Sequence, residues 1–430
     1  MNERRWLLGL CGLYLMLAAG YAVLMPPWEG PDEPAHYLLA LNLARVGKFS
    51  SLENNYEAHQ PQAYYRLTSV PLKWLYLRDP EAVVYFRPEP DYSHAETRTP
   101  IFPWSDENFR ILPGMYLLRG LNILLGLGAW RVMYAGLRRL AGGRREIALG
   151  ALYFGALTPQ FLHTVATINN DVLGFLAGAF LFWLLSIFYE RGLTQGEILL
   201  AGVAALLLPL ATKLTVLPVS AAFLVILLWD QGKRWLRGRL VWGMVVFGLV
   251  VFAGLRWWAP EVWEYLWSNL IWRAFAVQPD ALTPDYLWTY GRRLLWSYWG
   301  TAGWLAVELP AWVVMGLTGL AGLGAGVSFW GMVKKEIVET AKQDRGLWLV
   351  VLVGVAAVVK NSLNTIFSQG RFLFPALGPI SFVVVSGWYQ LAPLPFRRFL
   401  PWGILFVMLI ANLVFWLGGI IPVYYQPFLG

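Results

Sequence analysis

The residues best suited to chemistry lie in a proline-rich acidic stretch that follows the first apolar segment. It reads Pro-Pro-Trp-Glu-Gly-Pro-Asp-Glu-Pro-Ala-His-Tyr over residues 26–37, with the carboxylate pair Asp32 and Glu33 at its centre. Adjacent carboxylates repel each other, so holding the pair near a membrane costs energy unless a proton, a metal ion or another cation compensates. Carboxylates near a bilayer usually mark function, which makes Asp32 a candidate general base that deprotonates an acceptor hydroxyl. The alternative is that Asp32 caps a helix with Pro34 in its first turn.

His36 adds a possible metal ligand and substrate contact to this stretch. Asp32 and His36 are four residues apart, so they would share one face of a helix. Together with Glu33 or His59 they could bind a divalent cation, and hard oxygen ligands would suit Mg²⁺ or Mn²⁺. No glycine-rich nucleotide-binding loop is visible in the sequence, so we expect no nucleotide cofactor.

A second polar motif reads Glu-Ala-His-Gln-Pro-Gln-Ala-Tyr-Tyr over residues 57–65. It predicts an extended turn that runs into an amphipathic helix. His59 and Gln60 offer hydrogen bonds to a phosphate or a sugar, and Tyr64 follows them as a further candidate substrate contact. The alternative reading is an ordinary surface loop.

Candidate contacts also occur near the ends of later apolar segments. Asn170 and Asp171 could position a sugar or a cation, or could cap the helix that begins there. Lys213 could bind a lipid phosphate or reach the membrane interface along its aliphatic stem. Arg371, next to Gln369, could grip a phosphate with its guanidinium fork or act as an interfacial anchor.

The composition is that of a membrane protein. Apolar residues make up 57% of the 430 residues and charged residues only 14%, whereas a soluble globular protein is about one quarter charged. The net charge of +8 comes from short basic clusters between apolar segments, which excludes nucleic acid as a partner. The single cysteine, Cys11, excludes an internal disulfide framework.

The apolar segments predict an all-α polytopic fold of about eleven spanning helices in one membrane domain, residues 1–430. We place these helices at 6–25, 111–136, 147–166, 170–189, 197–212, 214–230, 240–258, 305–330, 346–363, 371–391 and 399–420. The pair on either side of Lys213 is short, and Pro209 and Pro218 flank a break there. The first segment could also be a cleaved signal peptide, although its apolar stretch is long for one.

Basic residues predict the orientation. With the N-terminus inside the cell, the basic loops near 138–145, 191, 233–239, 334–345 and 397–398 all fall inside. The C-terminus and two long segments then lie outside. The first, 26–110, carries the acidic motif and interfacial helices, and the second, 259–304, is rich in Trp and Tyr.

An ordered set of motifs, joined to this topology, resembles a known superfamily. The motifs are Pro31-Asp32-Glu33-Pro34-Ala35-His36, His59-Gln60-Pro61, Tyr64-Tyr65, Asn169-Asn170-Asp171, Lys213-Leu214-Thr215, Ser297-Tyr298-Trp299-Gly300 and Gly370-Arg371-Phe372. The chain resembles the GT-C membrane glycosyltransferases, and within them bacterial membrane proteins related to protein O-mannosyltransferases and aminoarabinose transferases. The likeness covers about residues 1–391.

The resemblance implies an inverting transferase of the bacterial cytoplasmic membrane and cell envelope. Its donor would be a polyprenyl-phosphate sugar, and its acceptor a glycan, lipid or protein at the outer face. Asp32 matches the catalytic carboxylate of the first outer loop, with Glu33 as its partner. His59, Lys213 and Arg371 would contact the carrier phosphate. Aminoarabinose-type relatives often have a basic residue and two prolines where this chain has His59-Gln60-Pro61.

Two other functions fit the same broad architecture. A lipid-linked oligosaccharide polymerase or ligase would place key arginines in the later outer segment, where Arg256, Arg273, Arg292 and Arg293 lie. A transporter or flippase of a lipid-linked saccharide would need charges within the spans and often repeated halves. The sequence shows few such charges and no internal repeat, which favours the transferase.

Overall fold

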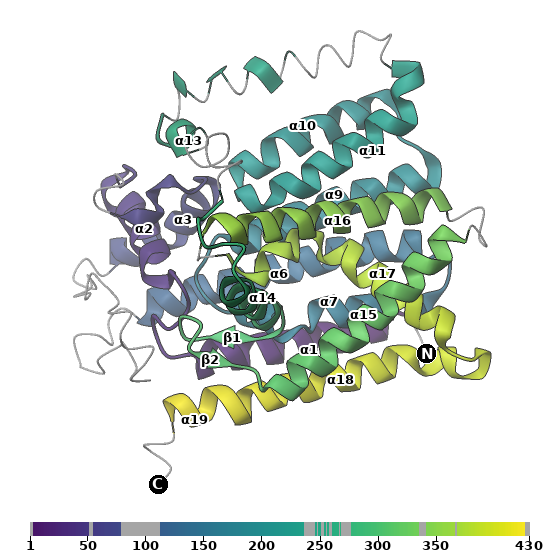
Figure 1. The fold of residues 1–430 in the computed structure, drawn as a ribbon. Helices are drawn as coiled ribbons and strands as arrows, with labels where there is room; N and C mark the ends of the chain where they lie inside the picture. The colour runs from purple at the N-terminus through teal and green to yellow at the C-terminus, as the bar shows by residue number, and fades with distance from the viewer. Residues whose placement is uncertain are drawn as a thin grey trace.

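The computed structural model shows long helices that run side by side (Figure 1). It describes residues 3–50, 55–78, 112–235, 277–334, 341–365 and 368–425, together with parts of 246–267. Figure 1 shows α2, α3 and the hairpin β1–β2 gathered at one end of this bundle. The all-α polytopic architecture predicted from the sequence is confirmed.

The elements follow one another along the chain as helices with one short hairpin. They are α1 (Glu3–Leu24), α2 (Glu33–Val46), η1 (Tyr56–His59), α3 (Ala63–Arg78), α6 (Leu112–Leu140), α7 (Arg145–Ala156), α8 (Pro159–Val165), α9 (Asp171–Arg191), α10 (Gln195–Ala211), η2 (Leu214–Val216), α11 (Leu217–Trp235), α13 (Pro260–Tyr265), α14 (Pro284–Trp299), β1 (Thr301–Ala302), β2 (Val307–Glu308), α15 (Ala311–Val333), α16 (Ala341–Asn364), η4 (Gly370–Ala376), α17 (Leu377–Leu391), η5 (Leu394–Phe399), α18 (Leu400–Phe415), η6 (Trp416–Ile420) and α19 (Ile421–Tyr424). The two strands are antiparallel, and Thr301 pairs with Glu308.

Seven helices among the described residues are long and apolar enough to cross a membrane. They are Trp6–Leu24, Leu112–Leu140, Asp171–Arg191, Ala311–Val333, Gln343–Asn364, Gly370–Leu391 and Leu394–Tyr424. Each coincides with a predicted span. Two further predicted spans are shorter apolar helices, Gln195–Ala211 and Leu214–Trp229, with the predicted break at Lys213 between them.

The predicted span 147–166 differs from the structure. It is divided into α7 and the short α8, because Pro159 lacks the N–H that would continue the first helix and instead occupies the first turn of the second. The predicted span 240–258 lies largely outside the described residues. Within the aromatic-rich segment 259–304, the structure describes the helices α13 and α14.

Small residues let two of the spanning helices, α15 and α17, approach each other closely. A Cβ built on Gly387 of α17 would lie 1.8 Å from the carbonyl oxygen of Gly324 on α15. Helices in a membrane associate largely through such close packing, because burial of apolar surface drives association little in lipid. These glycines therefore hold α17 against α15.

A substitution at Gly387 tests this packing. We expect Gly387→Val to lower the stability of the folded protein by about 1–3 kcal/mol or more, because a side chain would collide with backbone that cannot move freely. Gly322→Val on α15 is the matched control, since a Cβ there meets open space within 4 Å. Thermal unfolding in detergent measures both variants. Equal unfolding temperatures for the two would contradict the packing account.

Candidate active site

One buried arginine, Arg119 of α6, ties the end of α1 to the acidic loop. Its Nη1 donates to the carbonyls of Ala22 at 2.6 Å and Met25 at 2.8 Å. Its Nη2 donates to the carbonyl of Pro26 at 3.1 Å and to Glu33 Oε2 at 2.7 Å, and its Nε donates to Glu33 Oε1 at 2.8 Å. These bonds match all five N–H donors of a guanidinium group. Arg119 thus satisfies carbonyls that the end of α1 would leave without partners.

The Glu33 carboxylate is fully enclosed by hydrogen-bond donors. Besides the two bonds from Arg119, its oxygens accept from the backbone N–H groups of Trp28 at 3.1 Å and Ile168 at 3.0 Å. Neither side chain of the Glu33–Arg119 pair has any exposed surface. This geometry favours a positioning role for Glu33 over direct participation in a reaction.

Arg119 was missed by the sequence reasoning, although one signal pointed to it. It lies within a predicted span, and a cation inside an apolar helix needs an anionic partner. The sequence did not say which carboxylate that partner is.

Asp32 lies in a different environment from its neighbour. It occupies the position just before α2, as the helix-start prediction required, but its side chain makes no capping hydrogen bond. Its backbone is left-handed, with φ 61°, as is that of Trp28 with φ 69°. Such conformations are costly outside glycine and cluster at functional sites. Asp32 Oδ1 accepts from the hydroxyl of Tyr56 at 3.0 Å, and the residue is partly exposed.

The fold brings a third carboxyl group, Glu57 of η1, close to Asp32. Glu57 is only 8% exposed. Its burial, followed by the charge of Asp32, raises the pKa of Glu57 to about 7. Glu57 belongs to the second polar motif of the sequence, but nothing in the local pattern indicated its nearness to Asp32.

His59 and Gln60 form a fixed turn beside these carboxyl groups. His59 Nδ1 donates to the carbonyl of Tyr56 at 2.7 Å, because a carbonyl can only accept. Its Nε2 is then free to accept from Gln60 Nε2 at 3.1 Å. Burial lowers the pKa of His59, which agrees with this neutral form. The other end of the Gln60 amide, Oε1, accepts from Asn170 Nδ2 at 3.1 Å.

Two cations share one buried carboxylate at the start of α9. Lys213 Nζ lies 2.5 Å from Asp171 Oδ1 and also donates to Asn170 Oδ1 at 2.7 Å. Arg371 Nε lies 3.4 Å from Asp171 Oδ2, and neither of these two atoms has a hydrogen-bond partner among the described residues. Gln369 Oε1 is likewise buried without one. The group of Lys213, Asp171 and Arg371 keeps a net positive charge, so it can attract an anion.

Asn169, and not Asn170 or Asp171, caps the start of α9. The backbone N–H of Asp171 donates to Asn169 Oδ1 at 3.0 Å, so Asn169 supplies the local cap. The side chain of Asn170, which precedes α9, makes no capping bond. Asp171 is thereby left to pair with the cations.

Close backbone contacts place Arg371 beside α9. The segment η4 crosses α9 at Gly178, where a Cβ would lie 2.1 Å from the carbonyl oxygen of Pro375. On its other side, the N–H of Gly370 donates to Ser297 Oγ of α14 at 2.7 Å. A Cβ on Gly370 would lie 2.1 Å from the carbonyl oxygen of Leu294. Only glycine fits at either crossing.

His36 connects the acidic loop with the cationic group. Its Nδ1 lies 2.8 Å from the hydroxyl of Tyr65, and burial lowers the pKa of His36 well below its ordinary value. The next largest cause is the charge of Lys213, so the cations lie within electrostatic reach of α2. Tyr64 is placed differently, since its buried hydroxyl donates to Asn122 Oδ1 of α6 at 3.0 Å.

The sequence predicted a metal site at Asp32 and His36. Within the parts of the chain that the structure describes, no group of three or more His, Cys, Asp or Glu side chains could hold a metal ion. Asp32 and His36 do not make such a group with Glu33, whose oxygens already bind Arg119.

Comparisons with known proteins agree with this architecture. The family model of dolichyl-phosphate-mannose-protein mannosyltransferases matches residues 110–258, which include Arg119, Asp171 and Lys213 but not Asp32. ArnT from Cupriavidus metallidurans, in its crystal structure bound to undecaprenyl phosphate, superposes with a TM-score of 0.58 at 12% identity. That alignment covers 98% of this chain and 77% of ArnT.

The apo structure of the same ArnT gives a TM-score of 0.48 at 12% identity, over 96% of this chain and 76% of that one. No curated protein sequence matches the chain. The chain has the fold of the GT-C membrane glycosyltransferases, as the resemblance of its motifs predicted.

Substitutions in the Glu33–Arg119 pair should be strongly destabilising. Glu33→Gln and Arg119→Gln each leave one buried charge without its partner, at a cost of about 3–5 kcal/mol. Arg139→Gln is the matched control, because Arg139 pairs with Glu190 at an exposed site, where loss of a partner costs about 1 kcal/mol or less. Thermal unfolding in detergent measures all three. A similar loss of stability in all three variants would contradict a larger contribution from the buried ion pair.

The raised pKa of Glu57 predicts a pH-dependent stability. Because its pKa is higher in the folded than in the unfolded state, Glu57 contributes stability that is fully present below its ordinary pKa of 4.5. This contribution is lost as the pH rises through about 7. Glu57→Gln keeps the shape and removes the titration. We expect it to unfold near the wild-type temperature at about pH 5 and to be more stable by about 1–3 kcal/mol at about pH 8.

Glu190→Gln, at an exposed site, is the control for this pH series. A Glu57→Gln variant whose stability relative to wild type is the same at both pH values would refute the proposed titration.

Proposed function

We propose that this chain is an inverting glycosyltransferase that moves a sugar from a polyprenyl-phosphate carrier to an acceptor at the outer face of the membrane. One observation carries the proposal. The partly exposed carboxylate of Asp32 and the net positive group around Asp171 lie in one connected polar site. A chain of hydrogen bonds leads from Asp32 to Lys213 through Tyr56, His59, Gln60 and Asn170.

The reaction divides between these two parts of the site. Asp32 accepts the proton of the acceptor hydroxyl while the hydroxyl oxygen attacks the anomeric carbon of the sugar. The bond between that carbon and the carrier phosphate breaks, and the configuration at the carbon inverts. The leaving phosphate keeps the electron pair of the broken bond. Lys213 and Arg371 stabilise its growing negative charge, because their own charge is only partly neutralised by Asp171.

The other carboxyl groups support Asp32 in this scheme. Glu33 holds the acidic loop through Arg119. Glu57, whose pKa is about 7, is protonated in about half of the molecules at neutral pH, which weakens its repulsion of Asp32 and its attraction to the cations.

The position of the C-terminal helix supports the outer-face assignment. The hydroxyl of Tyr425 donates to the carbonyl of Leu24 at 3.1 Å, and that of Tyr424 donates to Glu29 Oε2 at 2.9 Å. The C-terminal end of the described chain therefore lies beside the acidic loop, at the far end of α1 from its start. If the N-terminus lies on the inner side of the membrane, the acidic loop and the C-terminal end of the described chain both lie on the outer side.

The carrier is proposed from the resemblance to ArnT, whose structure contains undecaprenyl phosphate, and from the positive charge beside Asp171. The acceptor can be a glycan, a lipid or a protein. Asp32 and His36 are the residues that would hold a Mg²⁺ or Mn²⁺ ion, as expected from their spacing. Treatment with EDTA followed by addition of either ion would test this metal site, since activity that EDTA leaves unchanged contradicts the metal.

Removal of the Asp32 carboxylate tests the proposal. Asp32→Asn should lower sugar transfer at least about 100-fold, because the general base is lost while the shape is kept. The measurement is transfer of radiolabelled sugar from membrane polyprenyl-phosphate donors in proteoliposomes, with thermal unfolding as the check on folding. Asp285→Asn, an exposed carboxylate of α14, should retain wild-type transfer.

Equal transfer by wild type and a folded Asp32→Asn variant would remove Asp32 from the mechanism. Movement of intact lipid-linked saccharide across the vesicle membrane without transfer would favour the flippase, and extension of a lipid-linked glycan would favour the polymerase.

A further inference from the structure

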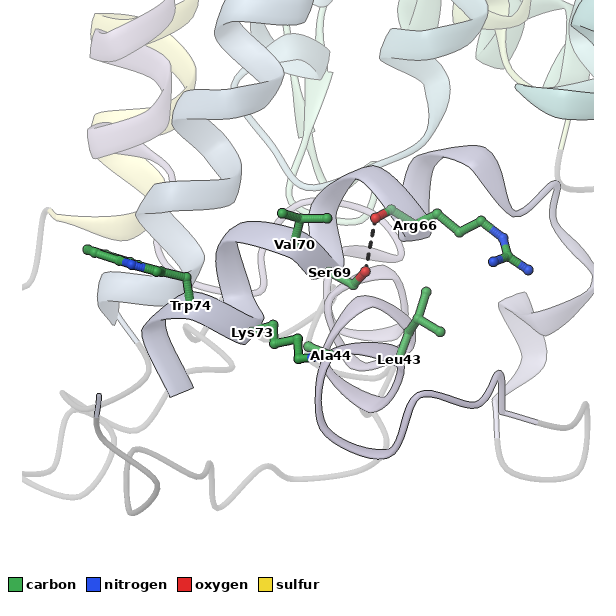
Figure 2. Close-up of a pocket in the computed structure, with 7 residues that line it drawn as sticks. All are labelled: Leu43, Ala44, Arg66, Ser69, Val70, Lys73 and Trp74. Carbon is green, nitrogen blue, oxygen red and sulfur yellow. Dashed lines mark hydrogen bonds between the residues drawn. The ribbon is translucent and has the colours of Figure 1, made fainter. Parts of the chain in front are cut away.

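A groove lies between α2 and α3 (Figure 2). Its volume is about 420 Å³, and it is lined by Leu43, Ala44, Arg66, Ser69, Val70, Lys73 and Trp74. The opposite face of α3 carries Tyr64 and Tyr65, whose hydroxyls contact Asn122 and His36. The groove is therefore on the side of α3 that faces away from the catalytic network.

Two cationic side chains, Arg66 and Lys73, line the groove. Within the described part of the chain, neither Arg66 nor Lys73 pairs with a carboxylate. Arg66 donates to the neutral side chain of Gln62 at 3.1 Å and lies 5.7 Å from the ring of Phe49. Figure 2 shows Lys73 reaching from α3 towards Ala44 of α2. An anionic group between the two helices would complement both cations.

An exposed apolar stripe runs along α3 beside these cations. Leu67 is 41% exposed, Val70 67% and Trp74 56%, and their spacing of three and four residues puts them on one face. Cations beside an exposed stripe of apolar and Trp side chains are typical of helices that lie in the membrane interface. The stripe gives an acyl chain a surface to lie on, which a small soluble anion would not use.

We propose that this groove binds an anionic phospholipid of the outer leaflet. Its phosphate lies between Arg66 and Lys73, and its acyl chains follow Val70 and Trp74. Lys and Arg are usually found on the inner side of a membrane protein. The predicted orientation puts α2 and α3 on the outer side, so Arg66 and Lys73 there indicate an anionic ligand. The bound lipid joins α2, which begins beside Asp32, to α3, which supports His36 through Tyr65.

Photo-crosslinking tests the site without measuring sugar transfer. The full chain is reconstituted in phosphatidylcholine vesicles with a photoactivatable phosphatidylglycerol or a photoactivatable phosphatidylcholine, and labelled peptides are mapped by mass spectrometry. We expect the phosphatidylglycerol probe to label the peptides of α2 and α3 preferentially. Each cation contributes about fivefold to affinity for anionic lipid, so Arg66→Gln with Lys73→Gln should reduce labelling of these peptides about 25-fold.

The matched control is Arg397→Gln with Arg398→Gln, which removes the same charge from η5 and should leave labelling of α2 and α3 unchanged. Arg66 and Lys73 are exposed, so the double variant should unfold at the wild-type temperature. Equal labelling by both probes, or labelling that survives the double substitution, would overturn the proposal. So would displacement of the lipid probe by excess inorganic phosphate, because the ligand would then be a small anion. None of these outcomes depends on the proposed transferase activity.

Discussion

The buried ion pair between Glu33 and Arg119 is the constraint on which the site depends. Removing a carboxylate and a guanidinium from water is expensive, and the cost is offset only when every polar atom finds a partner. Arg119 meets this condition with the last carbonyls of α1, and Glu33 with backbone N–H groups from the loop and from Ile168. The pair therefore joins α1, α2, α6 and the approach to α9 in one arrangement.

This arrangement separates the roles of two neighbouring carboxylates. Glu33 is enclosed, whereas Asp32 is partly exposed and held in a left-handed conformation at the start of α2. The same loop is secured from other directions, because Trp304 Nε1 donates to the carbonyl of Trp28 at 3.0 Å and Tyr424 contacts Glu29. Strain at Trp28 and Asp32 persists because the surrounding contacts leave the loop few alternatives.

Much of this could be predicted from local sequence patterns. Hydrophobic length predicted the spanning helices, and proline placement predicted the start of α2 and the break at Lys213. The resemblance to a superfamily assigned His59, Lys213 and Arg371 to the carrier phosphate, and the structure places Lys213 and Arg371 together beside Asp171. Each of these predictions required only a few neighbouring residues or an ordered set of short motifs.

The parts that escaped prediction depend on contacts between distant segments. The pairing of Arg119 with Glu33 arises only when α6 packs against the end of α1. The raised pKa of Glu57 needs both burial and the nearness of Asp32. The sequence predicted that His59 contacts a phosphate, but it could not show which groups of the protein lie beside the His59 ring. In the fold, its ring nitrogens bind the carbonyl of Tyr56 and the amide of Gln60.

The most direct test is an experimental structure of the Asp32→Asn variant with bound polyprenyl phosphate in a lipid nanodisc. The account predicts that the phosphate contacts Lys213 and Arg371 while Glu33 keeps its bonds to Arg119, with the side chain at position 32 facing the space where the sugar would sit. A phosphate bound away from both cations, or a Glu33 carboxylate that leaves Arg119 to contact the ligand, would contradict the division of roles proposed for this site.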